Sequence, residues 1–117
     1  MEKNLTITRG DTGLYAIDLR DANGKIIDIV DNITMYFTVK DNSNSTPFKF
    51  QKKSGNGITY SEEDKKFHLV IEPTDTSNLS YGEYVYDITI RKDNSRFTVI
   101  KGKFCIEYEV TFIENEG

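Results

Sequence analysis

One histidine and one cysteine are the residues of this chain best suited to nucleophilic chemistry. His68 and Cys105 each lie between two large apolar residues in a stretch where apolar and polar positions alternate. Because alternate side chains of a strand point to opposite faces, both groups are expected on the polar faces of two different strands. A thiol nucleophile needs its base within hydrogen-bond reach, so only a Cys–His pair formed between strands would support catalysis. We therefore predict that the protein is not an enzyme and has no catalytic residues.

Four oxygen-bearing residues near the start of the chain could be imagined as a calcium cage. Asp21, Asn23, Asp28 and Asp31 offer the ligand atoms that calcium prefers, but they lack the spacing of an EF-hand loop. Asp and Asn are also common in turns for conformational reasons. The single cysteine, Cys105, excludes an internal disulfide and a zinc site of the usual cysteine-rich kind. We predict no metal and no cofactor.

The tripeptide Arg9-Gly10-Asp11 matches the integrin-adhesion motif. That function requires a secreted protein and an exposed, mobile loop. Here the tripeptide joins two predicted strands, and no export signal precedes it. We therefore interpret it as a strand-connecting turn in which Gly10 supplies an unusual φ.

The segment from Leu79 to Tyr84, Leu-Ser-Tyr-Gly-Glu-Tyr, has the pattern of a tyrosine corner. In such a corner the phenol hydroxyl of the tyrosine donates to upstream backbone and secures a crossover between two sheets. The motif is structural and favours an immunoglobulin-like topology, although the chain contains no Trp. Tyr86 lies on the same inward row, so we expect it to be buried without a corner bond.

The elements that position these residues are strands. Ile, Val and Thr together number 31 and Tyr and Phe 14, whereas Ala occurs twice and Leu five times in 117 residues. β-Branched and aromatic residues favour strands, and the scarcity of good helix formers excludes a helical bundle or coiled coil. This length suits one domain, so we predict a single domain over residues 1–117 with its core at about 5–112.

Alternation of apolar and polar residues locates these strands most clearly over residues 33–40, 67–71, 84–90 and 104–112. Turn residues such as the Asn23-Gly24 pair recur every 8–12 positions. Together they predict an all-β, antiparallel immunoglobulin-like β-sandwich of eight or nine short strands.

Two local features interrupt the strands. One short helical turn is expected near residues 74–79, capped by Thr74 or Asp75 and burying Leu79. An unbroken strand from residue 97 to 112 would span about 50 Å, which is too long for this domain. We therefore expect a bulge or bend at Gly102.

Charge is distributed unevenly along the chain. The net charge of −4 argues against nucleic acid as a partner. Residues 91–103 carry five bases and one acid, whereas residues 104–117 carry four glutamates and no base. These charges belong to wet strand faces, and they pair either within one subunit or between subunits head to tail. We predict that the final strand, residues 104–112, and the basic stretch beside it form a partner-binding edge.

The N-terminus leads directly into a strand-like pattern. No apolar signal core precedes it, and no run of 18 apolar residues occurs in the chain. We therefore expect a protein without signal peptide or membrane insertion that is made and kept in a cytosol, unless a larger assembly carries it out.

In order and spacing, these motifs resemble a family of small bacteriophage structural domains that includes the N-terminal, immunoglobulin-like domain of the phage baseplate upper protein. The resemblance runs from about Leu5 to Phe112 and is densest between Leu69 and Ile88. The matching positions are Ile7-Thr8-Arg9-Gly10-Asp11-Thr12, Asp21-x-x-Gly24, Ile27-Asp28, Ile33-Thr34-x-x-Phe37-Thr38-Val39-Lys40, Leu69-x-Ile71-x-Pro73-x-Asp75-Thr76-x-x-Leu79-x-x-Gly82-x-Tyr84-x-Tyr86-Asp87-Ile88, Gly102-x-Phe104 and Glu109-Val110-Thr111.

The resemblance implies a non-enzymatic virion part, made in the bacterial host cytoplasm and released by lysis. We expect a structural or assembly module of a phage or prophage tail, at the baseplate, that contacts other tail proteins or further copies of itself. The baseplate upper protein continues into a long C-terminal section, and this chain stops at Gly117, so roles of that section are not carried over. The family supplies no residue-level binding site here.

A carbohydrate-binding module for host-surface adhesion is the alternative function. β-Sandwiches often bind glycans on aromatic platforms, and Tyr36, Tyr60 and Tyr81 are the aromatic residues to test. The absence of Trp weakens this alternative, because Trp is the strongest stacking side chain.

Overall fold

A computed structural model describes residues 2–20, 23–25, 32–42, 44 and 47–108 of the chain. Its strands are β1 (Leu5–Thr8), β2 (Gly13–Ile17), β3 (Ile33–Lys40), β4 (Phe50–Ser54), β5 (Gly57–Ser61), β6 (Lys66–Ile71), β7 (Gly82–Lys92) and β8 (Ser95–Glu107). One short helix, α1 (Pro73–Thr76), connects β6 to β7. The prediction of an all-β chain with one helical turn is confirmed.

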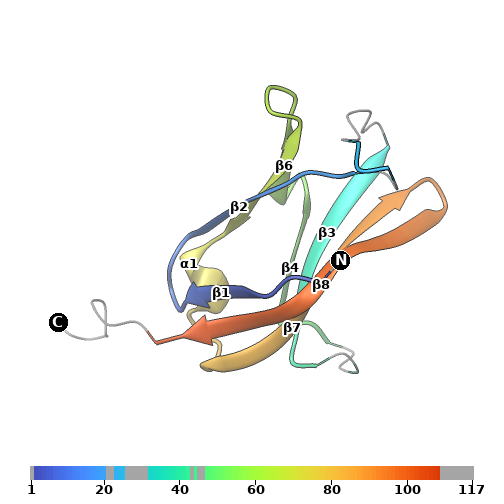
Figure 1. The fold of residues 1–117 in the computed structure, drawn as a ribbon. Helices are drawn as coiled ribbons and strands as arrows, with labels where there is room; N and C mark the ends of the chain where they lie inside the picture. Colours follow the sequence, from blue (N-terminus) through green and yellow to red (C-terminus); the bar gives the residue numbers. More distant parts are fainter. Residues whose placement is uncertain (1, 21–22, 26–31, 43, 45–46, 109–117) are drawn as a thin grey trace.

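The strands form one hydrogen-bonded sheet in the order β1-β8-β7-β3-β4-β5-β6-β2. Its two edge strands, β1 and β2, follow each other in the chain and are separated only by residues 9–12. So short a connection brings the two edges of the sheet close together, and the sheet curls into a nearly closed barrel (Figure 1).

Two strand pairings differ from the predicted antiparallel pattern. β1 runs parallel to β8, and β4 meets β5 in parallel over two residue pairs. The β4–β5 contact is a corner where the chain turns at Gly55 and Gly57, whose φ angles are +88° and +101°. All other strand pairings are antiparallel. The predicted immunoglobulin-like sandwich of antiparallel strands is therefore not confirmed.

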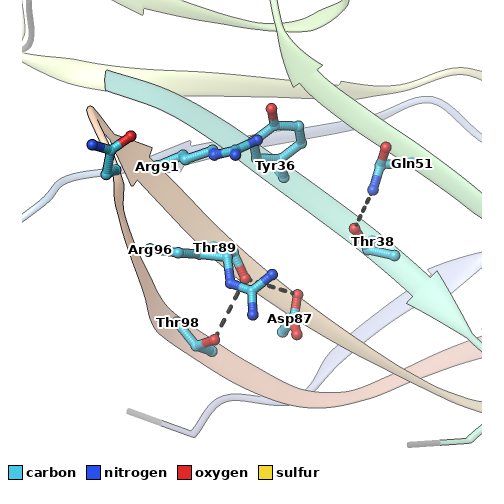
Figure 2. Close-up of a pocket in the computed structure, with 9 residues that line it drawn as sticks. Tyr36, Thr38, Gln51, Asp87, Thr89, Arg91, Arg96 and Thr98 are labelled. Atoms are coloured by element: carbon cyan, nitrogen blue, oxygen red, sulfur yellow. Dashed lines mark hydrogen bonds between the residues drawn. The ribbon is translucent and has the colours of Figure 1, made fainter. Parts of the chain in front are cut away.

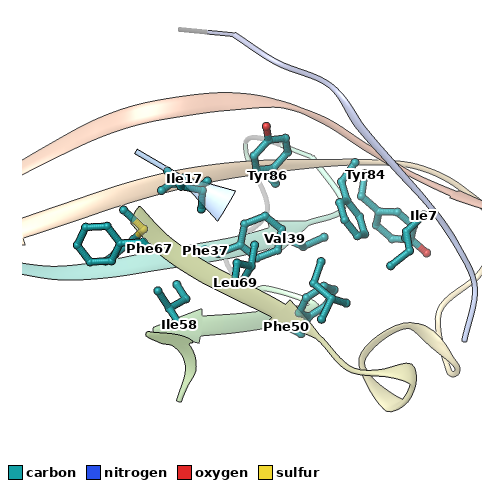
Figure 3. Packing of buried hydrophobic residues seen from close by; sticks show 14 of the residues in the cluster. Ile7, Ile17, Phe37, Val39, Phe50, Ile58, Phe67, Leu69, Tyr84 and Tyr86 are labelled. Atoms are coloured by element: carbon teal, nitrogen blue, oxygen red, sulfur yellow. The ribbon is translucent and has the colours of Figure 1, made fainter. Parts of the chain in front are cut away.

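The core lies inside the curled sheet, where the inward rows of the strands meet (Figure 3). Phe37 of β3 is fully buried, and its ring centroid lies 5.4–6.0 Å from those of Phe50, Tyr86 and Phe104. Burying a side chain of this size contributes roughly 1.5–3 kcal/mol. The alternation in the sequence identified these inward rows correctly. The buried apolar residues are Ile7, Ile17, Leu19, Met35, Phe37, Val39, Phe50, Ile58, Phe67, Leu69, Ile71, Tyr84, Tyr86, Ile88, Ile90, Phe104 and Ile106.

The N-cap of helix α1 lies two residues before Thr74, the first of its two predicted caps. Glu72 is the N-cap residue, and its backbone N–H donates to the Asp75 carboxylate at 2.7 Å. Pro73 occupies the first helical turn, where its missing N–H costs no hydrogen bond. The buried residue of the helix is Thr76, whereas the predicted Leu79 is half-buried. The predicted helix is confirmed, and its predicted cap is wrong.

Gly102 lies in a continuous strand, so the predicted bulge at this position is wrong. The register shift falls between Ile88 and Thr89 of β7 instead. A Cβ atom at Gly102 would overlap the backbone carbonyl of Lys3. The backbone N–H of Lys3 donates to the Lys101 carbonyl at 2.8 Å, which holds the N-terminal segment against β8. Glycine is needed here because two backbones approach each other closely.

The second half of β8 is an interior strand. β1 pairs with Phe104–Glu107, and Phe104 and Ile106 are buried. The predicted partner-binding edge is therefore wrong for these residues, because the N-terminal strand covers them. Residues 109–112 of that prediction lie outside the described residues.

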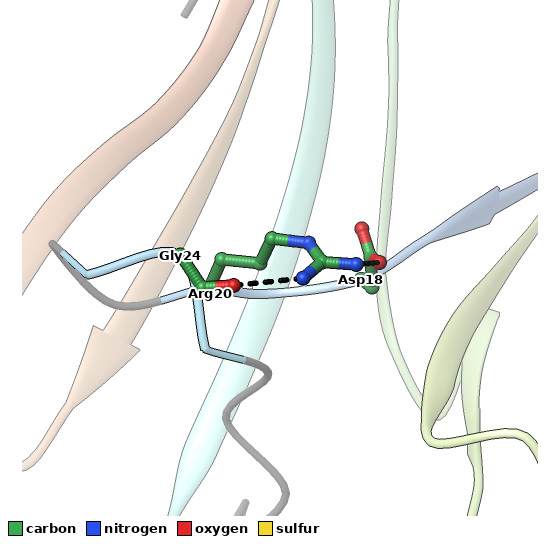
Figure 4. A network of polar contacts seen from close by, with 3 residues as sticks. All are labelled: Asp18, Arg20 and Gly24. Carbon is green, nitrogen blue, oxygen red and sulfur yellow. Dashed lines mark hydrogen bonds and ion pairs between the residues drawn. The ribbon is translucent and has the colours of Figure 1, made fainter.

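The turn after β2 agrees with the sequence (Figure 4). Gly24 has a φ of +83°, as the Asn-Gly pair predicts. The Arg20 guanidinium donates to the Gly24 carbonyl at 2.8 Å and binds the Asp18 carboxylate at 2.9 Å. Arg20 thus connects the end of β2 to the turn.

Candidate functional site

The two residues considered for nucleophilic catalysis lie on strands that are not neighbours in the sheet. His68 is on the outer face of β6 and Cys105 on the outer face of β8, and β7, β3, β4 and β5 separate these strands in the sheet order. The Nε2 atom of His68 lies 2.9 Å from the Asp64 carboxylate. Desolvation acts to raise the pKa of Asp64, but the hydrogen bond and charge of His68, together with hydrogen bonds from Lys66 and Ser61, lower that pKa. The structure does not bring a Cys–His pair together.

Of the four residues considered as calcium ligands and not predicted to bind it, the structure describes only Asn23. It lies in an exposed turn, and Asp21, Asp28 and Asp31 are outside the described residues. Within the described part of the chain, no cluster of three or more His, Cys, Asp or Glu residues could hold a metal ion.

The Arg9-Gly10-Asp11 tripeptide is the turn between β1 and β2. Gly10 has a φ of +83°, and its backbone N–H donates to the hydroxyl of the buried Thr76 at 2.9 Å. The guanidinium carbon of Arg9 lies 4.4 Å from the centroid of the Tyr81 ring. The interpretation as a structural turn is confirmed, since the tripeptide packs against α1 and the segment that follows it.

The three candidate tyrosines do not form one aromatic platform. The Tyr60 hydroxyl is buried without a hydrogen-bond partner, and its ring packs 4.9 Å from that of Phe67. The centroid of the Tyr81 ring lies 3.8 Å from the centroid of the Tyr108 ring, just after the end of β8. Only Tyr36 faces outward beside the polar residues of β7.

The tyrosine corner forms as predicted. The Tyr84 hydroxyl donates to the backbone carbonyl of Ser80 at 2.7 Å. Tyr86 is buried without a corner bond, as expected, but its hydroxyl donates to the Lys3 carbonyl at 2.6 Å, so it is not a control that lacks a hydrogen bond. Burial, and then the nearby Tyr15, raise the pKa of Tyr86 to about 12. The two tyrosines therefore anchor two different crossing segments.

The outer faces of β3, β4, β7 and β8 form a shallow hollow of about 740 Å³ (Figure 2). Strand alternation places its side chains, since they occupy the positions between the inward-facing core residues. No motif in the sequence marks this hollow as a site. The residues that line it are Tyr36, Thr38, Gln51, Asp87, Thr89, Arg91, Asn94, Arg96 and Thr98.

Two arginines dominate the electrostatics of this hollow. Arg91 of β7 pairs directly with Arg96 of β8 in the antiparallel register, and among the described residues that line the hollow Asp87 is the only acid. The Thr89 hydroxyl donates to Asp87 at 3.3 Å. Neither guanidinium hydrogen-bonds or ion-pairs with any residue that the structure describes. Like charges directly opposite each other destabilise a sheet, so the pair is suited to holding an anion between its two cations.

The neutral lining residues supply hydrogen-bonding groups around the arginines. The Gln51 side-chain amide donates to the Thr38 hydroxyl at 2.9 Å, and the hydroxyls of Thr89 and Thr98 lie 3.5 Å apart. Neither a histidine nor a cysteine lines the hollow. The arrangement is therefore suited to binding rather than to nucleophilic chemistry.

The chain was compared with known families, curated proteins and solved structures. No protein-family model matches it, and no curated protein matches it significantly. Its fold is similar to a solved structure, the N-terminal domain of ORF48 of phage TP901-1, with a TM-score of 0.51. The likeness covers 90% of this chain and 85% of that domain at 10% sequence identity. At this identity the likeness concerns the fold alone.

The described residues contain one helix, α1, and no helix among them is long or apolar enough to cross a membrane.

Proposed function

We propose that this chain is a non-enzymatic structural or assembly module of a phage or prophage virion, located at the tail baseplate. The likeness of its fold to a phage protein domain over 90% of the chain is the observation that carries this proposal. The resemblance of the sequence to small baseplate-associated domains from Leu5 to Phe112 adds the tail location. We also propose that residues 1–117 form a single domain and that its fold is immunoglobulin-like.

The chemistry of the surface is compatible with this role. His68 and Cys105 lie on strands that are not neighbours in the sheet, and the hollow on the outer faces of β3, β4, β7 and β8 is lined by side chains that bind rather than react. Other tail or baseplate proteins are the proposed partners. The protein is then synthesised in the bacterial host cytoplasm and ends up in the virion.

A carbohydrate-binding module stays the second candidate, and the outer-face hollow favours it. Tyr36 lines this hollow together with hydrogen-bonding groups such as Gln51 and Asn94. A glycan array would test this candidate, with binding expected to depend on Tyr36 and to be lost in Tyr36→Ala.

The virion assignment is tested on tail particles of the phage or prophage that encodes the chain. Particles are purified on a density gradient and probed with an antibody raised against the folded protein. We expect the chain in a fixed ratio to the particles, with label at one tail end in electron micrographs. Intact particles that contain none of the chain, while it remains in the soluble fraction, would overturn the proposal.

A further inference from the structure

We propose that the outer-face hollow binds the acidic C-terminal segment of a second copy of this chain, residues 107–116, so that subunits associate head to tail. The inference rests on the proposed function only in treating the domain as one that works through protein contacts. It is carried by the Arg91–Arg96 pair, by the distribution of charge along the chain and by the length of β8.

The charge of the hollow is positive among the described residues that line it. Arg91 and Arg96 lie directly opposite each other on adjacent strands, and residues 91–98 at this end of the hairpin are all exposed. Asp87 supplies one negative charge among the lining residues, and the two guanidiniums supply two positive charges. A carboxylate placed between the guanidiniums would replace repulsion with two charge-assisted contacts. The hollow therefore selects an acidic occupant.

An acidic segment suited to this hollow lies at the C-terminal end of the chain. Residues 107–116 contain Glu107, Glu109, Glu114 and Glu116 and no base. Between Glu109 and Glu114 this segment reads Val-Thr-Phe-Ile, a composition that favours an extended conformation. It therefore offers carboxylates on a backbone suited to lie along a sheet.

The acidic segment does not readily reach the hollow of its own subunit. Arg96 and Glu107 are eleven residues apart on one continuous strand, or about 36 Å at roughly 3.3 Å per residue. Glu116, the last glutamate of the segment, lies nine residues beyond Glu107 and would reach at most about 31 Å along a fully extended chain directed back along β8. The β7–β8 hairpin and the end of β8 also lie at opposite ends of the molecule in Figure 1. The backbone of the acidic segment therefore reaches the hollow of a neighbouring subunit more readily than its own.

A contact of this kind joins two different surfaces of the same chain. Such a heterologous contact closes into a ring or continues as an open chain, according to the rotation between subunits. Because the contact pairs the arginines of the exposed hairpin with carboxylates, the association is expected to weaken as salt increases.

The contact is tested with a labelled peptide of residues 107–117 and the complete chain in solution. We expect saturable binding by fluorescence anisotropy, weakened on going from about 50 mM to about 500 mM salt. Arg96→Glu is expected to reduce the affinity by about tenfold or more, because it turns an attraction into a repulsion. Lys65→Glu makes the same change of charge in the exposed β5–β6 turn and is expected to leave the affinity unchanged. A peptide whose glutamates are replaced by glutamine is expected not to bind.

Self-association is then measured by light scattering over a range of protein concentrations. We expect the average molecular mass of the natural chain to increase with protein concentration at low salt. The variants Arg96→Glu and Glu114→Lys are each expected to keep the mass of a monomer. Mixing these two variants is expected to restore association, because each supplies a complementary charge to the other.

A natural chain that is a strict monomer at low salt, together with a peptide that does not bind, would overturn the inference. Binding of an acidic oligosaccharide in the hollow without binding of the peptide would also count against it. Neither result bears on the antibody test of purified tail particles, so the two proposals fail separately.

Discussion

The first half of β8, residues 95–100, and its second half, residues 101–107, differ in the contacts that their polar groups make. In the second half, the backbone N–H of Lys103 donates to the Asn4 side chain at 3.0 Å and the Lys101 carbonyl accepts from Lys3. In the first half, residues 95–98 are exposed and Arg96 faces Arg91. Phe97 belongs to the inward row, yet 54% of it is exposed, because the hairpin extends past the core.

This contrast separates residues that stabilise the fold from residues available for binding. The second half is covered on one side by β7 and on the other by β1 and the residues before it, so a change there is expected to cost stability. The first half carries a repulsion that contributes nothing to folding. Four predictions test the difference, beginning with the largest effect.

Gly102→Ala is expected to be the most damaging single substitution. A Cβ atom at this position would overlap the Lys3 carbonyl, and backbone cannot move aside as the end of a side chain can. We expect the free energy of unfolding to fall by about 3 kcal/mol, with loss of the N-terminal segment from β8. Urea denaturation measures the effect.

The matched control for this substitution is Gly55→Ala in the β4–β5 corner. Gly55 has a φ of +88° but open space around its Cβ position, so only backbone strain of about 1 kcal/mol is expected. Equal losses at the two glycines would show that the N-terminal segment is not held tightly against β8.

The second prediction concerns the two tyrosines that anchor crossing segments. Tyr84→Phe and Tyr86→Phe each strand a carbonyl acceptor, of Ser80 and Lys3 respectively. Each is expected to lower the free energy of unfolding by roughly 1–3 kcal/mol. Tyr36→Phe is the control, because the Tyr36 hydroxyl makes no hydrogen bond with a described residue, and its cost is expected to stay within about 0.5 kcal/mol. A melting temperature of Tyr84→Phe equal to that of the natural chain would contradict the corner.

The sequence was sufficient to predict which face of each strand is buried. Met35, Phe37 and Val39 alternate with polar neighbours, and the structure buries them completely. The corner at Tyr84 and the turn at Gly24 are local patterns, so their geometry was also predictable. Alternation sets the face of a strand because it depends on a period of two residues within that strand.

The neighbours of each strand were not predictable in the same way. Alternation is unchanged whether β8 is an edge or lies beside β1, so Phe104 and Ile106 were placed on an exposed edge by mistake. Gly102 has two physical explanations within a strand, a bulge or a close backbone approach, and only the position of Lys3 distinguishes them. Contacts between the two ends of a chain leave no local signal.

The hollow was predictable from the sequence only in part. Asp93 has a φ of +55°, and the two-residue turn at Asp93-Asn94 sets Arg91 opposite Arg96. A hairpin with so short a turn has a fixed register, so this pairing was derivable from the turn residues. The contribution of Tyr36 and Gln51 was not, because it depends on β3 and β4 lying beside this hairpin.

The third prediction uses pH to test the tyrosine that holds the N-terminal segment. The pKa of Tyr86 is raised to about 12, against about 10 in an unfolded chain, so the folded state binds this proton more tightly. Stability is therefore retained below about pH 9 and lost as the pH rises through about 10 to 12. At pH 11 the loss due to Tyr86 is expected to be about 1.4 kcal/mol.

Urea denaturation between about pH 9 and pH 11 measures this loss, and Tyr86→Phe is expected to give a flatter dependence on pH than the natural chain. Parallel curves for the two proteins would show that the Tyr86 proton is not linked to folding.

The smallest and most informative effect is expected at the first half of β8. Arg96→Glu replaces a pair of like charges with a pair of opposite charges, so the free energy of unfolding is expected to rise by roughly 0.2–1 kcal/mol at low salt. The gain should shrink with added salt, because the side chains are exposed. Arg96→Gln removes the repulsion without adding an attraction, and an intermediate value is expected.

The double variant Arg91→Glu/Arg96→Glu is the control that identifies the pair as the cause. It restores two like charges, now negative, so the gain of Arg96→Glu should disappear. Arg96→Glu would then be more stable than the natural chain while losing affinity for the acidic segment. If Arg96 lowers the stability of the fold and is needed for binding, binding explains why an arginine occupies this position. If Arg96→Glu instead destabilises the protein, Arg96 belongs to the fold and the two halves of β8 do not differ in kind.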